Sequence, residues 1–234
     1  MYNIAIILAG GTGSRVGGSM PKQLMPLADG RSVLEHAVDA FEAAPAINEI
    51  GIVMHPDWMA EAEALRAKNT WRKVTKIIAG GTERWESSWK AIEAFRSQKS
   101  DVSLWLHDAA RPFVSQRILA DVAAALETHE AVTVAVPVMD TLYKVQRDKV
   151  QSTRDSVQST KVESIPSRSE YMRAQTPQAF HLDIIAEAYR RAIESGAVAA
   201  TDDAGIVHRY MPEQPISIVP GEEANKKITY REDL

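Results

Sequence analysis

The chain has 234 residues, of which 45% are hydrophobic and 25% charged, and its formal net charge is -4. This composition suits a globular protein with a substantial core, and it argues against general binding to nucleic acid or anionic membranes, which depends on excess lysine and arginine. The sequence contains no cysteine, which excludes disulfides, thiolate metal sites and a cysteine nucleophile. With no apolar stretch of ~18 residues and no secretory signal pattern, we expect a cytoplasmic protein without a membrane partner.

The first predicted element is a strand at residues 4–8, a short apolar run that ends at a glycine. Such runs are typical of strands buried on both faces of a sheet. Ser32 and Glu35 then have the spacing of a capping box, and apolar residues follow at helical intervals. A strand, a long loop and an amphipathic helix are therefore expected at the start of the chain.

Strands and helices continue to alternate after this first unit. Further strands are predicted at residues 50–54, 74–78, 102–106 and 132–136, with helices around residues 58–68, 85–92 and 118–126. This alternation indicates right-handed βαβ units and a largely parallel sheet, in which ligands bind beyond the carboxyl ends of the strands. Glycine turns and the pair His107 and Asp108 follow directly after predicted strands, so they point to a site at that edge.

Residues 140–168 have a different texture, because they are polar, alternate only in patches and lack helical periodicity. We predict an extended arm or hairpin that is stable only against another surface, which suggests a homodimer; the alternative is a disordered surface loop. A helix around residues 182–193 and a strand at residues 216–219 complete the chain. The prediction is a single α/β domain over residues 1–234 with residues 140–168 as a dimerisation arm.

The glycine-rich stretch after the first strand matches neither of the common nucleotide-binding motifs. Lys22 follows Pro21 rather than a glycine, so the stretch is not a P-loop, and Val16 stands where a dinucleotide fingerprint has its third glycine. What remains is a loop long enough to wrap a triphosphate, carrying two cations, Arg15 and Lys22. The alternative for this stretch alone is a tight turn.

Seven short segments occur together in a specific order: LAGGTGSRVGGSMPKQ, GGTERWESS, HDAARPF, MDTLYK, AQTPQAF, ATDDA and ANKKIT. This ordered set resembles the methylerythritol-phosphate and ribitol-phosphate cytidylyltransferase family, which makes CDP-alditols, and the resemblance covers essentially the whole chain. It implies a Rossmann-like, mostly parallel sheet flanked by helices, of the nucleotidyltransferase type, with a protruding β-arm.

The resemblance also implies a nucleotide site built from the two glycine turns. Its backbone contacts to CTP are expected at Ala9, Gly10, Gly11 and Gly13, and its contacts to the cytosine and ribose at Gly80, Gly81, Thr82, Ser87 and Ala109. Thr82 stands where the family often has an aspartate, so a neutral hydroxyl replaces a carboxylate there.

Three cations match the catalytic positions of the family: Arg15, Lys22 and Lys227, with Lys226 as the alternative to Lys227 if the register differs by one. The acceptor side is implied at Asp108, Arg111, Thr141, Arg168, Thr176 and Thr201. Thr141 and Arg168 lie on or beside the arm, so they are expected to reach the site of a partner subunit. For Asp108 and Arg111, the alternative is a buried salt bridge within their turn.

The implied reaction joins CTP to an alditol phosphate, either 2-C-methyl-D-erythritol 4-phosphate or D-ribitol 5-phosphate, and releases pyrophosphate. The acceptor phosphate attacks the α-phosphorus in line, and Mg²⁺ is expected to bind mainly through the phosphates, because the sequence has no dense metal-ligand motif. The two acceptors correspond to isoprenoid-precursor and wall-polymer synthesis. Other sugar-phosphate nucleotidyltransferases and a non-catalytic CTP-binding module are the alternative functions.

Overall fold

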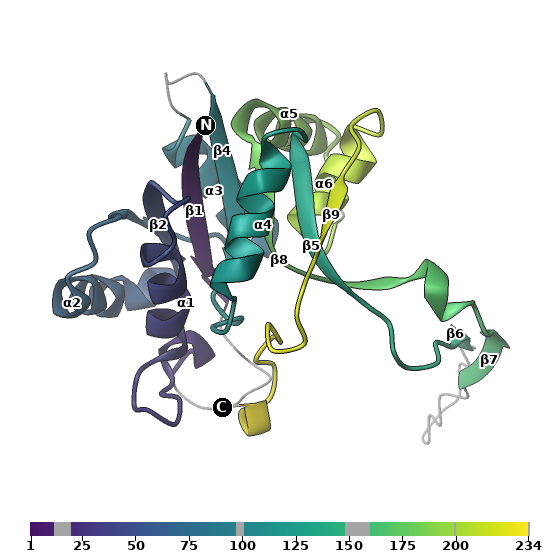
Figure 1. The fold of residues 1–234 in the computed structure, drawn as a ribbon, viewed down its shortest axis with the longest axis horizontal. Helices are drawn as coiled ribbons and strands as arrows, with labels where there is room; N and C mark the ends of the chain where they lie inside the picture. Colours follow the sequence, from purple (N-terminus) through teal and green to yellow (C-terminus); the bar gives the residue numbers. More distant parts are fainter. Residues whose placement is uncertain (12–19, 97–100, 148–159, 199, 234) are drawn as a thin grey trace.

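The computed structural model describes residues 1–11, 20–96, 101–147, 160–198 and 200–233 (Figure 1). Within these ranges the main sheet has seven strands in the order β3-β2-β1-β4-β8-β5-β9. The strands are β1 (Tyr2–Ala9), β2 (Glu49–Met54), β3 (Val74–Ala79), β4 (Val102–Asp108), β5 (Ala131–Pro137), β8 (Met172–His181) and β9 (Ser217–Pro220). All neighbouring strands are parallel except that β8 runs antiparallel to β4 and β5. The mostly parallel α/β sheet predicted from the sequence is confirmed, whereas β8 was not predicted.

Helices cover both faces of this sheet (Figure 1). On one face lie α1 (Val33–Glu42), α2 (Met59–Asn69) and α4 (Gln116–Leu126), and on the other lie α3 (Arg84–Ala94), α5 (Leu182–Glu194) and α6 (Asp203–Tyr210). Strand β1 contributes side chains to the hydrophobic core on each face of the sheet. Ile7 packs with the first set of helices and Ile6 with the second. Burial on both faces explains why the strands are continuous apolar runs rather than alternating ones.

The predicted capping box is present at the start of α1. The Glu35 amide donates to Ser32 Oγ over 3.2 Å, and the Ser32 amide donates to Glu35 Oε2 over 2.8 Å. Just after α5, Gly196 has a φ of +74°. Glycine adopts that left-handed backbone without steric cost, which suits the end of a helix.

The register of the parallel strands brings their carboxyl ends level. Ala9 pairs with Met54, Met54 pairs with Ala79, and Leu8 pairs with Asp108. The chain after residue 220 crosses the same edge, where the Ile228 amide donates to the carbonyl of Ala110 over 2.8 Å. The two glycine turns, the end of β4 and the C-terminal segment therefore share one edge of the sheet.

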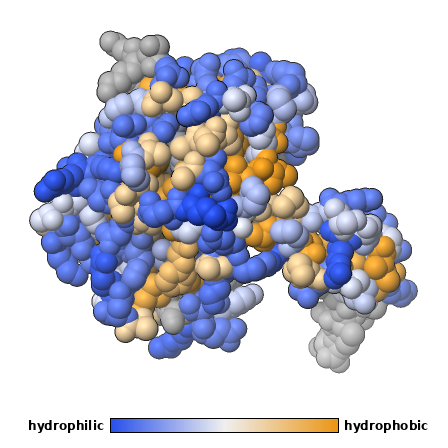
Figure 2. Space-filling view, in the orientation of Figure 1, coloured by the Kyte–Doolittle hydropathy of each residue, from blue (hydrophilic) through white to orange (hydrophobic). Residues whose placement is uncertain are grey.

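Residues 140–168 leave the body between β5 and β8 (Figure 1). They include β6 (Lys144–Arg147) and β7 (Thr160–Ser164), which form an antiparallel pair, followed by the short 3-10 helix η3 (Arg168–Glu170). This segment, called the arm below, and its junction with the body expose several large apolar side chains: Met139, Tyr143, Val145, Val162, Ile165, Tyr171 and Met172. Figure 2 shows hydrophobic surface on the arm, which projects away from the body. None of the helices in the described ranges is long and apolar enough to cross a membrane.

Candidate active site

The two glycine turns meet at the edge of the sheet. A Cβ added to Gly10 would lie 3.2 Å from Ser87 Oγ and 3.8 Å from the Cα of Gly80, so the two backbones approach closely. The Gly81 amide donates to Ser87 Oγ over 3.0 Å, and a Cβ at Gly81 would lie only 2.2 Å from the Cβ of Glu86. A side chain at these positions would crowd Ser87, Glu86 or the facing backbone, so glycine allows the two turns to approach closely. Four residues expected at the nucleotide are thus brought together.

The start of α3 is held by Glu86, whose carboxylate accepts the Thr82 amide over 2.7 Å. The Thr82 side chain is exposed beside this contact. Ser87 Oγ also donates to the carbonyl of Glu83 over 3.3 Å. With its proton toward Glu83 and one lone pair accepting the Gly81 amide, Ser87 Oγ has one further lone pair that can accept a hydrogen bond.

The start of the glycine-rich loop is anchored by Gln23, a residue that sequence reasoning did not single out. Its Nε2 donates to the carbonyls of Ala9 over 3.2 Å and Gly11 over 2.9 Å, and the side chain is buried. Ala109 lies nearby, because its amide donates to the carbonyl of Leu8 over 3.0 Å. Gly13 and Arg15 lie outside the described residues.

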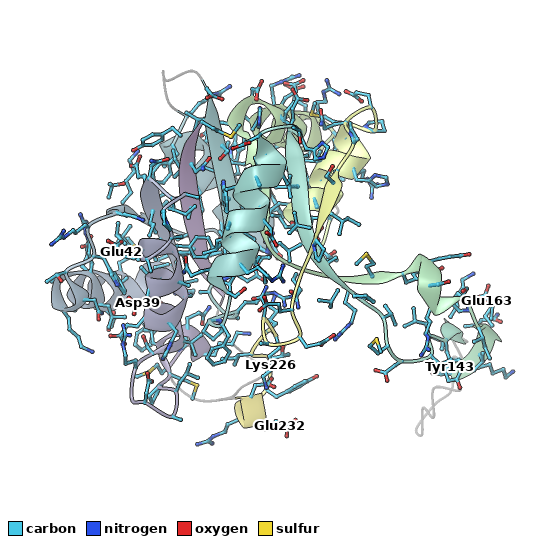
Figure 3. All side chains as sticks on the ribbon, in the orientation of Figure 1. Asp39, Glu42, Tyr143, Glu163, Lys226 and Glu232 are labelled. Atoms are coloured by element: carbon cyan, nitrogen blue, oxygen red, sulfur yellow. The ribbon has the colours of Figure 1, made fainter. Side chains whose placement is uncertain are left out.

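The two predicted catalytic lysines converge on the same edge from opposite ends of the chain. Lys22 Nζ donates to the carbonyl of Ile228 over 2.7 Å, and Lys227 Nζ lies 2.6 Å from Asp108 Oδ2. Lys226, labelled in the C-terminal segment in Figure 3, pairs instead with Asp233 over 3.4 Å at the surface. Of the two adjacent lysines, Lys227 is therefore the one directed toward Asp108.

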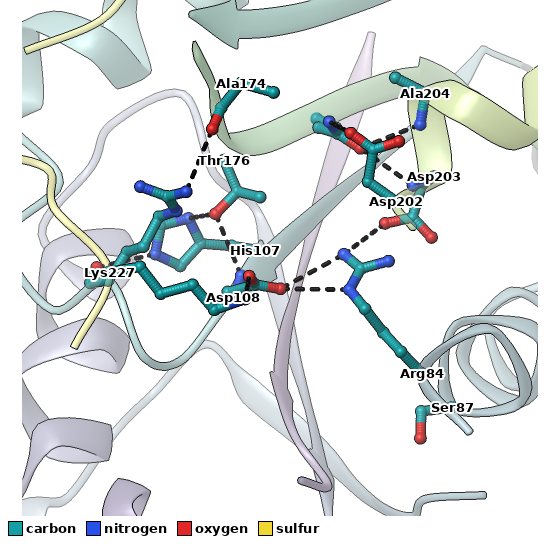
Figure 4. Close-up of polar contacts among 12 residues, drawn as sticks. Arg84, Ser87, His107, Asp108, Ala174, Thr176, Asp202, Asp203, Ala204 and Lys227 are labelled. Atoms are coloured by element: carbon teal, nitrogen blue, oxygen red, sulfur yellow. Dashed lines mark hydrogen bonds and ion pairs between the residues drawn. The ribbon is translucent and has the colours of Figure 1, made fainter. Parts of the chain in front are cut away.

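Asp108 lies between two cations rather than pairing within its own turn (Figure 4). Its Oδ1 is 3.3 Å from Arg84 Nε and its Oδ2 is 2.6 Å from Lys227 Nζ. Burial favours the neutral acid, but the charges of Arg84 and Lys227 outweigh burial and hold the pKa of Asp108 well below its ordinary range. The carboxylate is therefore ionised at neutral pH.

Arg111 uses its guanidinium on the backbone. Nη1 donates to the carbonyl of Asn225 over 2.8 Å and Nη2 to that of Ala174 over 3.2 Å, while the buried Nε has no partner. Asn225 in turn donates to the carbonyl of Thr176 over 2.9 Å. Arg111 thus ties the segment that carries Lys227 to β8.

His107, Thr176 and Asp108 form a directed chain of hydrogen bonds. The Asp108 amide donates to Thr176 Oγ1 over 3.1 Å, Thr176 Oγ1 is 3.0 Å from His107 Nδ1, and His107 Nε2 is 3.0 Å from the carbonyl of Arg111. A carbonyl only accepts, so Nε2 carries the proton and Thr176 donates to Nδ1. Burial is the main cause that lowers the pKa of His107 to about 4, so the ring is neutral and fixes the turn after β4.

Comparison with known proteins identifies the family of this chain. Residues 3–234 match the family model of IspD, 2-C-methyl-D-erythritol 4-phosphate cytidylyltransferase. The chain belongs to this cytidylyltransferase family. It is 44% identical to the 2-C-methyl-D-erythritol 4-phosphate cytidylyltransferase of Thermobifida fusca (strain YX), over 98% of this chain and 89% of that protein.

A second relative is named for a different activity. The bifunctional ribulose 5-phosphate reductase/CDP-ribitol pyrophosphorylase Bcs1 of Haemophilus influenzae is 38% identical over 99% of this chain, which spans 46% of that longer protein. Among solved structures, 4-diphosphocytidyl-2C-methyl-D-erythritol synthase from Anaerococcus prevotii DSM 20548 superposes with a TM-score of 0.81 at 27% identity. That match covers 99% of this chain and 92% of the solved one.

The remaining residues that the sequence predicts on the acceptor side lie in two places. Thr201 is exposed just before α6, whose N-cap Asp202 accepts the Gly205 amide over 2.8 Å. Thr141 and Arg168 are exposed on the arm, where Arg168 donates to the carbonyl of Met139. Figure 3 shows the arm, with Tyr143 labelled, well away from the C-terminal segment. Within one chain, these two residues do not join the group around Asp108.

Two charged residues that were not predicted, Arg84 and Asp203, lie beside Asp108. Arg84 Nη2 lies 2.7 Å from Asp203 Oδ2, and Asp203 Oδ1 accepts the Tyr189 hydroxyl over 2.6 Å. Both residues stand inside the quoted segments GGTERWESS and ATDDA, and their charge in otherwise glycine- and alanine-rich turns was the available signal. In the part of the chain that the structure describes, no group of three or more histidine, aspartate or glutamate side chains is arranged to hold a metal ion.

The buried neutral His107 predicts a loss of stability in acid. Its pKa is about 4 in the folded protein against 6.5 for the free side chain, so the unfolded chain binds the additional proton between these values. This contribution is intact above pH 6.5 and falls as the pH drops toward 4, by about 3 kcal/mol at most. Urea-unfolding midpoints should therefore decline less steeply with acid in His107→Gln than in the wild type. Exposed His129 supplies the control, because His129→Gln should keep the wild-type slope; equal slopes in all three proteins would contradict the assignment.

Proposed function

We propose that the chain joins CTP to an alditol phosphate and releases pyrophosphate. The family match over residues 3–234 supports this activity, and the convergence of Lys22 and Lys227 beside two side-chain-free glycine turns is the observation that carries it. As acceptors we propose 2-C-methyl-D-erythritol 4-phosphate first, because the relative at 44% identity carries that name, and D-ribitol 5-phosphate second, because Bcs1 of Haemophilus influenzae is named for CDP-ribitol.

The proposed reaction needs electrostatic help more than it needs a base. The acceptor phosphate already carries an anionic oxygen, so the main obstacle is the repulsion between two polyanions. We propose that Lys22 and Lys227 contact the phosphates of CTP, with Lys227 at the α-phosphate, where the acceptor oxygen adds in line and pyrophosphate leaves. Both ammonium groups are already held at the edge of the sheet, by the Ile228 carbonyl and by Asp108, so little reorganisation is required. We propose the same role for Arg15 at the triphosphate.

The glycine turns and Ser87 supply groups that suit recognition of cytosine. The remaining lone pair of Ser87 Oγ is an acceptor, which suits the exocyclic amino group of cytosine. The absence of side chains at Gly10, Gly80 and Gly81 allows the base and ribose to approach the backbone closely. Thr82 and Ala109 border this proposed nucleotide site.

For Mg²⁺, we propose that the ion binds through the triphosphate oxygens and water, which are ligands that it prefers. The residues present fit that arrangement, because the carboxylate oxygens of Asp108 each face a cation. When bound, the ion would neutralise phosphate charge and so add to the effect of the lysines.

We further propose that the protein is a cytoplasmic homodimer in which the arm of one subunit completes the site of the other. The arm exposes Tyr143, Val162 and Ile165, with exposed fractions of 58%, 54% and 62%, which favours burial against a second copy. Thr141 and Arg168 would then reach the partner's acceptor site together with its Asp108, Thr176 and Thr201.

The direct test supplies the purified protein with CTP, Mg²⁺ and each alditol phosphate in turn. We expect pyrophosphate release and formation of the matching CDP-alditol, with UTP much less active. If CTP binds but neither acceptor yields pyrophosphate, the chain is a CTP-binding module. Turnover with sugar 1-phosphates alone would make it a different nucleotidyltransferase.

Removing either proposed catalytic lysine should slow the reaction strongly. For Lys22→Ala and Lys227→Ala we expect a loss of roughly 3 kcal/mol in transition-state stabilisation, about two orders of magnitude in kcat, because a preorganised positive group is lost. Lys226→Ala is the matched control. Lys226 is adjacent to Lys227 but pairs with Asp233 at the surface, so this variant should retain nearly full activity. Wild-type turnover in Lys227→Ala would exclude the proposed role.

Mixing two inactive variants tests the shared site. If Arg168 acts in the partner's site, unfolding and refolding Arg168→Ala together with Lys227→Ala should restore about a quarter of wild-type activity, because half of the dimers are mixed and each has one intact site. Mixing Lys22→Ala with Lys227→Ala should restore none, since both lysines belong to one body. Equal recovery in the two mixtures, or a monomer by sedimentation, would count against the proposal.

A further inference from the structure

Arg84 occupies a position that the proposed reaction does not yet explain. It is the first residue of α3, directly after the second glycine turn, and its guanidinium reaches the ends of two other elements (Figure 4). Nε and Nη2 lie 3.3 Å from Asp108 Oδ1 at the end of β4, and Nη2 lies 2.7 Å from Asp203 Oδ2 at the start of α6. One side chain therefore joins three elements beside the predicted acceptor site.

Asp203, the other partner of Arg84, is held by several hydrogen bonds. Asp203 is fully buried, its Oδ1 accepts the Tyr189 hydroxyl over 2.6 Å, and its amide donates to Gln178 Oε1 over 3.1 Å. Burial alone would disfavour the charged guanidinium, but the carboxylates of Asp203 and Asp108 outweigh burial and raise the pKa of Arg84. Arg84 is thus a permanent cation anchored on Asp203.

At Asp108, the two carboxylate oxygens each face a different cation. Oδ1 faces Arg84, which leaves Oδ2 alone for Lys227. Without Arg84, the carboxylate would be free to turn, and both of its oxygens would be available to Lys227. Lys227 would then be held more tightly by Asp108 and would be less available to the CTP α-phosphate. Asp108 and Asp203 would both lose the positive charge of Arg84.

We propose that Arg84 is a positioning residue: anchored on Asp203, it fixes the orientation of Asp108 and thereby sets where Lys227 meets the reacting phosphate. This inference rests on the proposed function for its kinetic consequence. The shape of the group matters as well as its charge, because the arginine fork contacts both carboxylates at once, whereas a lysine ammonium is a single point.

The kinetic test compares Arg84→Met and Arg84→Lys with the wild type. We expect kcat/KM for the alditol phosphate to fall about 10- to 100-fold in Arg84→Met, the loss typical of small misplacements of a reacting group, with only partial rescue by lysine. The affinity for CTP alone, measured by calorimetry, should fall by a smaller factor than kcat/KM, because Lys227 is one of several groups proposed to contact CTP and the glycine turns are untouched. Arg190→Met is the control: Arg190 also makes two ion pairs, with Glu187 and Glu194, but on the outer surface of α5.

A double-mutant cycle separates positioning from a general effect on folding. If Arg84 acts through Asp108, Arg84→Met should cost much less in an Asp108→Asn background than in the wild type. If Arg84 only secures α6, the cost should be the same in both backgrounds and should vanish in Asp203→Asn instead. Equal costs in the two backgrounds, or a loss of CTP affinity as large as the loss of kcat/KM, would overturn the proposal.

A crystal structure of Arg84→Lys provides a readout that does not depend on turnover. We expect the Asp108 carboxylate to be rotated and Lys227 Nζ to be displaced from its present place 2.6 Å from Oδ2. If the wild type releases no pyrophosphate, the proposed function fails while this structural test still decides the positioning role. Unchanged positions of Asp108 and Lys227 would refute that role even in an active enzyme.

Discussion

The ion pairs of Asp108 are the interaction on which the arrangement of the site depends. A buried carboxylate is costly unless it is paired, and here the two partners, Arg84 and Lys227, come from distant parts of the chain. The pairing therefore does more than neutralise a charge. It fastens the start of α3 and the C-terminal segment to the end of β4, and these are the segments that border the proposed nucleotide and acceptor sites.

Strand β8 supports the same edge from the middle of the sheet. Its buried polar side chains each hold a different element: Gln175 donates to the carbonyl of Glu222 over 2.8 Å, Thr176 accepts the Asp108 amide, and Gln178 donates to Asp202 Oδ2 over 2.8 Å. One antiparallel strand thus positions the C-terminal segment, the turn after β4 and the start of α6. These hydrogen bonds make the site a property of the whole sheet edge rather than of one loop.

Neutral and charged groups occupy different parts of the site. The glycine turns present backbone and one committed hydroxyl, which suits discrimination of a base by hydrogen bonding, while the cations lie toward the C-terminal segment, where phosphate charge would accumulate. The chain has an overall net charge of -4, so its positive potential is local. Such an arrangement favours two anionic ligands without making the whole surface attractive to polyanions.

The sequence by itself determined the features that are encoded locally: the apolar strands, the capping box at Ser32, the glycine turns and, through the ordered motifs, the cytidylyltransferase family. Strand β8 escaped prediction because its polar residues Gln175, Thr176 and Gln178 are buried by cross-strand partners, which hides the apolar pattern of a central strand. Only the tertiary structure decided that Arg84 meets Asp203, 119 residues away, and that Asp108 pairs across the site rather than with Arg111. A charged residue expected to be buried needs an oppositely charged partner. Which residue becomes that partner depends on how the sheet and helices bring distant segments together.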